Sequence, residues 1–239
     1  MGLSTANEFT IDVILIDETV VADSQHVEGY DSQASGPVSH AEGQESLALG
    51  NISHAEGWGT IAAGRAAHTE GWNTKVIKNY GHAEGTHTIA GYNAHAEGAK
   101  SKALGQNSHA EGTDTMASGA YSHAEGYETE SEGWHSHSEG HRTKSIGEMS
   151  HAEGDLTLAE GKQSHAEGNS TVASNLAAHA EGTLSVASGI NSHAQNYKTV
   201  ASGDAAHSEG RETEASGDSA HAEGKKTKAL NEASHAEGA

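Results

Sequence analysis

The chain of 239 residues contains no cysteine, so neither a disulfide nor a thiolate metal site contributes to its fold. It has one phenylalanine and only 33% hydrophobic residues, too few to fill the wide core of a globular domain of this length. No run of about 18 apolar residues is present, and the opening MGLSTANEFTIDVILID lacks the charged start and long apolar stretch of a secretory signal. These absences predict a thin core of small side chains and no membrane insertion.

Positive charge is also scarce. The chain carries 13 Lys and Arg against 34 Asp and Glu, which gives a formal charge of −21 with histidine neutral. Basic residues are not clustered anywhere along the sequence. This balance argues against nucleic acid and against anionic membrane surfaces as direct partners.

Histidine recurs at a fixed spacing along almost the whole chain. Sixteen of the 19 histidines follow one another at a constant step of fourteen positions, except for one step that is a single position shorter, between His82 and His95. These ladder histidines are His26, His40, His54, His68, His82, His95, His109, His123, His137, His151, His165, His179, His193, His207, His221 and His235. A disordered chain would not keep such a register, so the period indicates a repeat architecture.

Aligned on this histidine, the unit reads S-H-A-E-G-x-x-T-φ-A-S-G-x-x, where φ is an often apolar site. Glu stands two residues after the His in fifteen copies, with Gln195 as the exception. Gly stands three residues after the His in fifteen copies, with Asn196 in the other, and ten residues after it in eleven. Asn tolerates the left-handed region next best after Gly, so both glycine positions are predicted to be corners with φ above zero.

Two arms of about five residues with alternating character, joined by two corners, describe one coil of a β-solenoid. The density of glycine and β-branched residues excludes a helical repeat. Small residues such as Ala41, Ser46 and Ala48 share one parity and are predicted to point into the coil. His and Glu share the opposite parity and project outward on one flank. The φ residues project outward on the other flank: Leu47, Ile61, Ile89, Met116, Leu158, Val172, Val186 and Val200.

An interior lined by Ala, Ser, Thr and Gly buries little apolar area, so an isolated chain is expected to be only marginally stable. Burying one outer flank of several chains against each other is the available remedy, which predicts a homo-oligomer. Sixteen coils at a spacing of roughly 4.8 Å predict a rod about 75 Å long.

Copies such as SLALGNISHAEG (46–57) and SKALGQNSHAEG (101–112) resemble the fourteen-residue head repeat of YadA-like trimeric autotransporter adhesins, S-V-A-I-G-x-x-S-x-A-x-G-x-x. The resemblance covers residues 26–238. HAEG-rich versions also resemble tail-fibre and appendage proteins of bacteriophages and prophages. The resemblance implies an all-β fold, a left-handed parallel β-roll of about 16 fourteen-residue coils, assembled as a parallel homotrimer.

Two regions are expected. Residues 1–25, which include the alternating FTIDVILID, form an N-terminal strand and cap or the junction with a preceding segment, because solenoid ends need caps. Residues 26–239 form the HAEG-repeat β-solenoid.

With the family's register, the His and Glu arm faces the threefold axis, where hydrogen bonds between His and Glu of different chains replace apolar packing. The residues predicted for this axial ladder are His40, Glu42, His54, Glu56, His109, Glu111, His123, Glu125, His151, Glu153, His165, Glu167, His221 and Glu223. The alternative is a solvated polar flank, with the φ residues forming the seam between chains. The uniform occurrence of His at this position favours the axial ladder, because a solvated flank has no physical reason to keep His over Gln, Lys or Thr.

The repeated pairs do not predict an enzyme. A His and a Glu two residues apart could serve as base and orienter, but catalysis needs one positioned pair in a pocket. Sixteen equivalent pairs on a rod offer no unique cleft, so no catalytic residue and no cofactor are expected. The only candidates for a metal are His135 and His137 of WHSHSEG, whose like parity would stack two three-histidine rings on the axis.

Two functions remain open. The first is a structural or receptor-binding segment of a phage or prophage tail fibre in the virion. The second is the head of an adhesin at the bacterial cell surface, which binds host matrix or glycan. In both the partner beyond the homotrimer is a cell-surface glycan or protein receptor, and Trp58, Trp72 and Trp134 near the corners could stack on a sugar.

Overall fold

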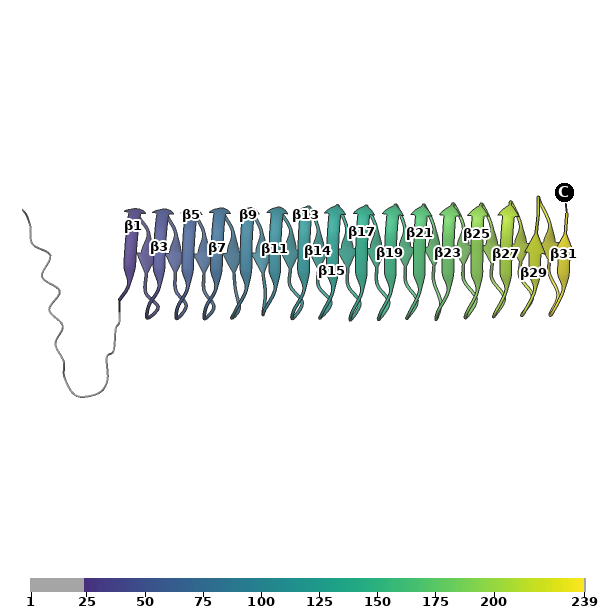
Figure 1. Ribbon diagram of the computed structural model, residues 1–239, viewed down its shortest axis with the longest axis horizontal. Coiled ribbons are helices and arrows are strands. Elements are labelled where there is room, and N and C mark those ends of the chain that lie inside the picture. Colours follow the sequence, from purple (N-terminus) through teal and green to yellow (C-terminus); the bar gives the residue numbers. More distant parts are fainter. Residues whose placement is uncertain (1–23, 239) are drawn as a thin grey trace, which may run out of the picture.

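The computed structural model describes residues 24–238, and all of their regular secondary structure is β-strand. Each coil contributes one strand to each of two parallel sheets, and the coils stack along a straight rod (Figure 1). This confirms the all-β parallel solenoid of fourteen-residue coils. The stretch FTIDVILID and the rest of residues 1–23 lie outside the described residues. Across residues 24–238 there is no helix that could span a membrane.

The first sheet contains the strands that begin at the ladder histidines: β1 (His26–Tyr30), β3 (His40–Gln44), β5 (His54–Trp58), β7 (His68–Trp72), β9 (His82–Thr86), β11 (His95–Ala99), β13 (His109–Thr113), β15 (His123–Tyr127), β17 (His137–His141), β19 (His151–Asp155), β21 (His165–Asn169), β23 (His179–Thr183), β25 (His193–Tyr197), β27 (His207–Arg211), β29 (His221–Glu223) and β31 (His235–Glu237).

The second sheet contains two-residue strands: β2 (Gln33–Ala34), β4 (Leu47–Ala48), β6 (Ile61–Ala62), β8 (Lys75–Val76), β10 (Ile89–Ala90), β12 (Lys102–Ala103), β14 (Met116–Ala117), β16 (Glu130–Ser131), β18 (Lys144–Ser145), β20 (Leu158–Ala159), β22 (Val172–Ala173), β24 (Val186–Ala187), β26 (Val200–Ala201), β28 (Glu214–Ala215) and β30 (Lys228–Ala229). This arm is shorter than the sequence predicts, because the bends on either side of it take up the remaining residues.

Successive coils pair in register, so that each residue lies beside its counterpart one coil further on. Between β3 and β5, for example, His40 pairs with His54 and Glu42 with Glu56. The one shorter coil keeps this register, since β9 and β11 still pair from His82 and His95 onward. Its missing residue is lost from the turn after β10, where a shorter connection leaves both sheets intact.

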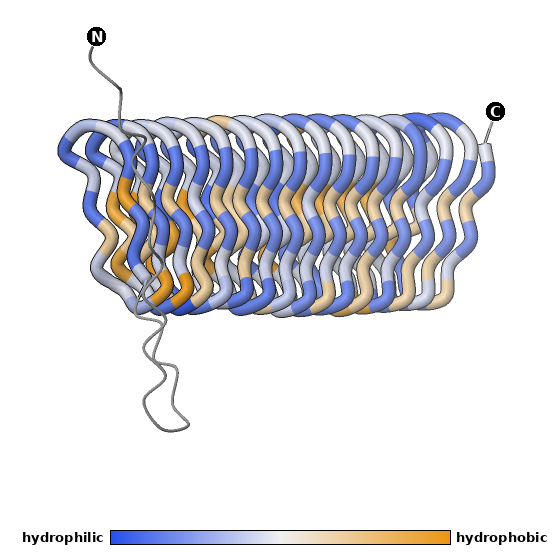
Figure 2. The backbone as a smooth tube through the Cα atoms, turned by 60° about the vertical axis from the view of Figure 1, so that its left-hand side comes forward, coloured by the Kyte–Doolittle hydropathy of each residue, from blue (hydrophilic) through white to orange (hydrophobic). Residues whose placement is uncertain are grey.

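The interior of the rod is made of small side chains, as the parity predicted. Ala41 and Ala48 are fully buried in one coil, together with Ser46 between them. The same columns hold Ala, Ser or Thr in the other described coils except at Val27 and Val76, and Val76 is the largest fully buried side chain. Because like residues stack on like, bands of equal hydropathy run along the rod (Figure 2). The core is therefore thin but continuous.

The two repeated glycines, three and ten residues after the ladder histidine, do not form the corners that the sequence predicted. Gly43 has the expected positive φ of 109°, but it lies within β3 rather than at a corner. Gly50, ten residues after the histidine, does not have a positive φ, so that expectation was wrong. Its reason is steric: a Cβ on Gly50 would lie 1.8 Å from the carbonyl oxygen of Gly64 in the next coil. Glycine is required there because successive backbones approach closely at the turn.

The corners themselves place non-glycine residues in the left-handed region. In one coil these are Glu45, with φ of 56°, and Ile52, with φ of 59°. This conformation costs roughly 1–2 kcal/mol for a residue with a side chain. Hydrogen bonds between coils hold it in place, because the N–H of Glu45 donates to the carbonyl of Tyr30 at 2.9 Å and that of Ile52 to Pro37 at 2.8 Å. Stacking thus stabilises corners that a single coil would not keep.

A serine stands before nine of the sixteen ladder histidines, and in most of these coils its side chain closes the second corner. In one coil the Ser53 hydroxyl donates to the carbonyl of Gly50 at 2.7 Å, and its N–H donates to the same oxygen at 3.3 Å. Ser108 and Ser122 repeat the hydroxyl contact in their own coils. By contrast, several buried threonine hydroxyls within the rod, such as that of Thr115, have no hydrogen-bond partner.

We predict that Gly112→Val disrupts one coil and that Thr113→Val, at the next position, does not. Gly112 has φ of 117°, and a Cβ there would lie 2.1 Å from the carbonyl oxygen of Gly126, which belongs to the backbone and cannot turn aside. The strained φ alone costs about 1–3 kcal/mol per chain. Thermal unfolding followed by circular dichroism should show a lower midpoint for Gly112→Val only. Equal midpoints would contradict the close approach of the coils at this glycine.

A second pair of substitutions tests the interior hydroxyls. Thr115→Val keeps the shape and removes an unpartnered buried hydroxyl, so the free energy of unfolding should stay the same or rise by up to about 1 kcal/mol. Ser122→Ala removes the 2.6 Å hydrogen bond to Gly119 and should lower it by about 1 kcal/mol. Denaturant unfolding measures both; a clear loss of stability in Thr115→Val would show that its hydroxyl has a partner.

Candidate interaction face

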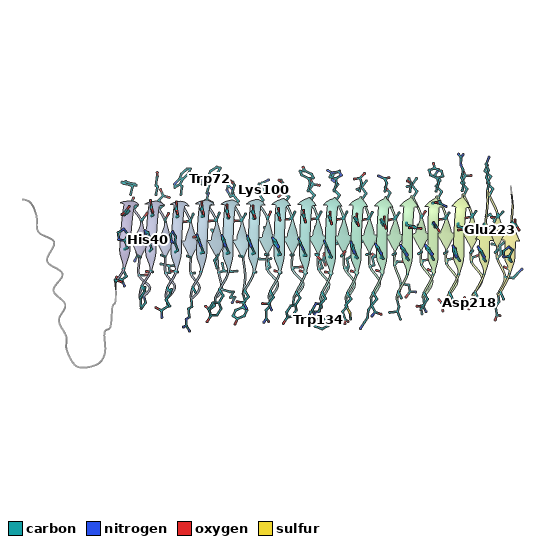
Figure 3. All side chains as sticks on the ribbon, in the orientation of Figure 1. His40, Trp72, Lys100, Trp134, Asp218 and Glu223 are labelled. Carbon is teal, nitrogen blue, oxygen red and sulfur yellow. The ribbon has the colours of Figure 1, made fainter. Side chains whose placement is uncertain are left out.

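The outer surface of the first sheet carries the ladder histidine and the acidic residue two positions later in each coil, and we call it the His–Glu face. Both side chains lie on the same side because residues two apart in a strand do so. In Figure 3, His40 lies on the strands midway between the edges of the rod, whereas Trp72 and Lys100 lie along one edge and Trp134 and Asp218 along the other. The face is therefore a flat strip between two rows of corners.

The histidines form an uninterrupted stack from His26 to His235. Centroids of successive rings are 4.7–4.9 Å apart. Most rings are close to parallel, as between His123 and His137 at 1°, while the pairs at the two ends are edge-to-face. Between His40 and His221, the histidine side chains that lie within 4.0 Å of a Glu carboxylate are 33–41% exposed.

In eleven interior coils the Nε2 atom of the ladder ring faces the carboxylate of its own coil without bonding to it. The distances between Nε2 and Oε2 are 3.6–3.9 Å, for example 3.8 Å from His109 to Glu111. These separations are too long for hydrogen bonds. Nε2 is shielded from solvent and has no hydrogen-bond partner in thirteen of the rings. The His–Glu face thus holds desolvated nitrogens beside carboxylates that they do not reach.

All fourteen residues predicted for the axial ladder lie on this face, in the paired strands β3, β5, β13, β15, β19, β21 and β29. The sequence therefore located the face and its register. The structure describes one chain, so the position of this face relative to a threefold axis stays a prediction.

Gln195 alters the pattern at one place. The coil that begins at His193 has no carboxylate of its own, and Glu181 from the preceding coil turns to His193 instead, with Oε1 3.6 Å from its Nε2. The side chain of Glu181 is only 29% exposed, less than most carboxylates of the ladder. One neutral residue thus shifts a pairing from within a coil to between coils.

Five ladder histidines have a pKa below its ordinary value: His82, His137, His165, His179 and His207. Burial is the main cause, because it disfavours the charged imidazolium. Repulsion from the neighbouring rings acts in the same direction, and the nearby glutamates raise the pKa but do not overcome the other two effects. These five rings are therefore neutral near pH 7.

The carboxylates of this face repeat at every coil without opposite charges in line with them, since Glu pairs with Glu from β1 to β23. Several variable columns instead alternate in sign between coils. Arg142 donates to Glu128 at 2.7 Å, and Lys162 lies 3.0 Å from Glu148. A column of like charges is unfavourable in water, so the His–Glu face is the surface of this rod that gains most from a partner.

The outer face of the second sheet is the alternative seam. Leu47, Ile61 and Val172 are partly buried there, and Leu49 and Ile77 beside this column are 41% and 50% exposed. Charged residues interrupt this surface, as where Lys144 pairs with Glu130. The surface is apolar in patches rather than throughout.

The histidines and tryptophans outside the ladder lie at the corners. His135 stacks on Tyr121, with ring centroids 4.8 Å apart, while His137 stacks on His123 and His151 in the ladder. His135 has a φ of 56°, so the chain bends there and is not an extended strand. The expectation that His135 and His137 point to the same side therefore does not apply. In the described part of the chain, neither residue belongs to a cluster of metal-ligating groups.

Trp58 and Trp72 stack on each other in successive coils, with ring centroids 5.5 Å apart. They are 48% and 43% exposed, and Trp134 at the opposite corner is 48% exposed. The sequence identified these rings as corner residues, and the structure adds that two of them form one aromatic surface.

We predict that the folded protein loses stability as the pH falls from 7.5 to 5.5. His82 and His137 have lowered pKa values in the fold, so the folded state binds fewer protons than the unfolded state below about pH 6.5. The free energy of unfolding then decreases on acidification and is unchanged above that pH. Thermal midpoints across this range, with His137→Gln expected to reduce the slope, measure the effect. A midpoint that stays constant or rises would mean that pairing of imidazolium with Glu dominates.

The chain was compared with known protein families, and the family that matches is itself a repeat. The sequence model of the YadA head domain repeat, which spans two copies, matches residues 41–67, 83–108, 96–122 and 180–206. No curated protein matches the chain. The matched segments contain both arms of the coil described above. These three regions of the chain, 41–67, 83–122 and 180–206, are therefore similar to YadA head repeats.

Proposed function

We propose that the chain is a non-enzymatic segment of an extracellular fibre, assembled as a parallel homotrimer with the His–Glu face of each chain toward the threefold axis. The observation that carries this proposal is the uniformity of one outer face. The ladder His is kept in every described coil and the Glu in all but one, while the outer residues of the second sheet vary between apolar and charged. In a parallel trimer each level of the axis has the same surroundings, so it favours the same residues at every level.

The surface chemistry supports an assembly of this kind. Ladder rings such as those of His40, His109 and His193 leave about a third or more of the side chain exposed in a single chain. A ladder ring of a partner chain would pack against this exposed part. N–H groups of histidines from other chains would donate hydrogen bonds to the in-line glutamates, which have no opposite charge beside them. Contacts between the three chains would also bury surface that the thin interior of one chain does not.

A structural role, rather than an enzymatic one, follows from the equivalence of the coils. The His and Glu pairs of the regular coils repeat along the rod with the same separation, so these pairs share the same surroundings. Catalysis requires a nucleophile or base together with groups that stabilise a transition state in one place. A rod that sets the distance between a receptor-binding surface and its anchor needs only rigidity and length.

Two settings fit this rod. The match to the YadA head repeat favours the head of a bacterial surface adhesin. The uniform HAEG motif favours a tail fibre of a phage or prophage, in which the rod belongs to the virion. In either setting the exposed Trp58 and Trp72 are the surface best suited to a glycan or protein receptor, because aromatic faces and edges contact sugars and side chains well. Neighbouring genes for tail proteins, or for an outer-membrane anchor, would separate the two.

The assembly is tested by sedimentation and by single cysteines. We expect a particle of three 24.5 kDa chains at micromolar concentration. The natural chain has no cysteine, so Glu111→Cys on the His–Glu face and Met116→Cys on the second sheet of the same coil each provide one thiol. Under mild oxidation Glu111→Cys should give a covalent dimer within each trimer, since a disulfide needs Cα atoms about 4.4–6.8 Å apart.

The matched variant makes the outcome decisive. Met116→Cys should stay uncrosslinked if the second sheet faces solvent. The reverse pattern would place the seam on the second sheet and overturn the axial His–Glu face. A folded monomer in sedimentation would overturn the trimer itself.

A further inference from the structure

One part of the His–Glu face differs from the regular ladder in a way that concerns ligand binding. Around the coil that begins at His193, the ligand atoms of His179, Glu181 and His193 all lie within 4.8 Å of one another. The rings of His179 and His193 are 4.7 Å apart and almost parallel, at 4°. Glu181 reaches across to the Nε2 of His193 at 3.6 Å. Two nitrogens and one carboxylate therefore converge between two coils.

The two imidazoles are prepared to act as ligands. The Nε2 atoms of His179 and His193 are shielded from solvent and lack a hydrogen-bond partner, which leaves polar atoms without the water that they would otherwise bind. Metal ions bind the neutral imidazole, whose lone pair is free.

The separations suit one small ion. Zinc binds histidine nitrogen at about 2.0–2.1 Å and carboxylate oxygen at about 2.0–2.2 Å, so two tetrahedral ligands of one ion lie roughly 3.4 Å apart. The 3.6 Å between Glu181 and His193 is close to that value. All three ligand atoms lie within 4.8 Å of one another, so the remaining one has to move by roughly 1 Å or a little more, which a small rotation of a half-buried side chain allows.

Gln195 distinguishes this cluster from a similar one a coil earlier, in which the ligand atoms of His165, Glu167 and His179 also lie within 4.8 Å of one another. In a regular coil, such as that of His123 and Glu125, the carboxylate stays beside the ring of its own coil at 3.8 Å. The replacement of Glu by Gln195 leaves His193 without such a partner, and Glu181 moves between the two rings. Because Gln195 carries no charge, the carboxylate of Glu181 is the only negative group beside His193 in these two coils. A cation bound there would have two imidazole ligands and one carboxylate ligand.

We propose that His179, Glu181 and His193 bind a first-row divalent transition-metal ion, with water completing the coordination. Imidazole nitrogens with one carboxylate are the ligands that Zn²⁺, Co²⁺ and Ni²⁺ accept, whereas Mg²⁺ prefers oxygen ligands alone. Such an ion cross-links adjacent coils and offsets the charge of the glutamate column. All three ligands belong to one chain, so this site does not depend on the trimer proposed above.

The experiment titrates the purified full-length assembly with Zn²⁺ at pH 7.5 by calorimetry, with Mg²⁺ as the control ion. Glu181→Gln is compared with Glu125→Gln, which removes a carboxylate from a regular coil outside this cluster. Binding of Zn²⁺ should saturate in the natural protein and in Glu125→Gln, and should weaken at least about tenfold in Glu181→Gln. Co²⁺ provides a second readout, because its visible spectrum reports nitrogen coordination and should change in His193→Gln.

Three results would overturn the site: no saturable heat with Zn²⁺, equal affinities in Glu181→Gln and Glu125→Gln, or equal affinity for Mg²⁺. Thermal midpoints of the metal-free variants confirm that each is folded. Loss of the trimer with retention of the Zn²⁺ response would contradict only the proposed assembly, so the two proposals fail separately.

Discussion

Stacking of nearly identical coils in parallel register is the constraint on which the rest of this structure depends. Each residue lies beside its own counterpart about one strand spacing away, so whatever occupies one coil must tolerate a copy of itself above and below. Small residues satisfy this in the interior, as Ala41 and Ala48 do. At the turns the backbones come so close that Gly50 has no room for a Cβ. Left-handed corners such as Glu45 survive because the next coil hydrogen-bonds to them.

The same constraint explains the chemistry of the outer face. Neutral imidazoles stack well on one another at 4.7–4.9 Å, whereas charged imidazoles at that distance repel. Burial first, and this repulsion second, lower the pKa of rings such as His137. Carboxylates in the same register have no stacking gain to offset their repulsion. Opposite charges in the variable columns, such as Arg142 and Glu128, show the arrangement that the glutamate column lacks. A face of this kind gains stability from a partner that offsets the charge of its carboxylates.

Residues that depart from the repeat create sites that occur at a single position along the periodic rod. Gln195 redirects Glu181 to another coil, and the stacked Trp58 and Trp72 create one exposed aromatic surface. Neither follows from the average unit. Each arises because a change in one coil acts on the coils beside it, so that an irregular residue defines a position along an otherwise uniform fibre.

The sequence by itself determined the period, the solenoid, the inward Ala, Ser and Thr and the common face of His and Glu, because these depend only on spacing and on the alternation of a strand. It did not determine the corners: the turn at Gly50 is governed by contact with the next coil, and Ile52 adopts a positive φ although its side chain disfavours it. It also placed His135 beside His137, which the bend at His135 prevents. Only the tertiary structure decided these points, since the forces that set them act between neighbouring coils rather than along the chain.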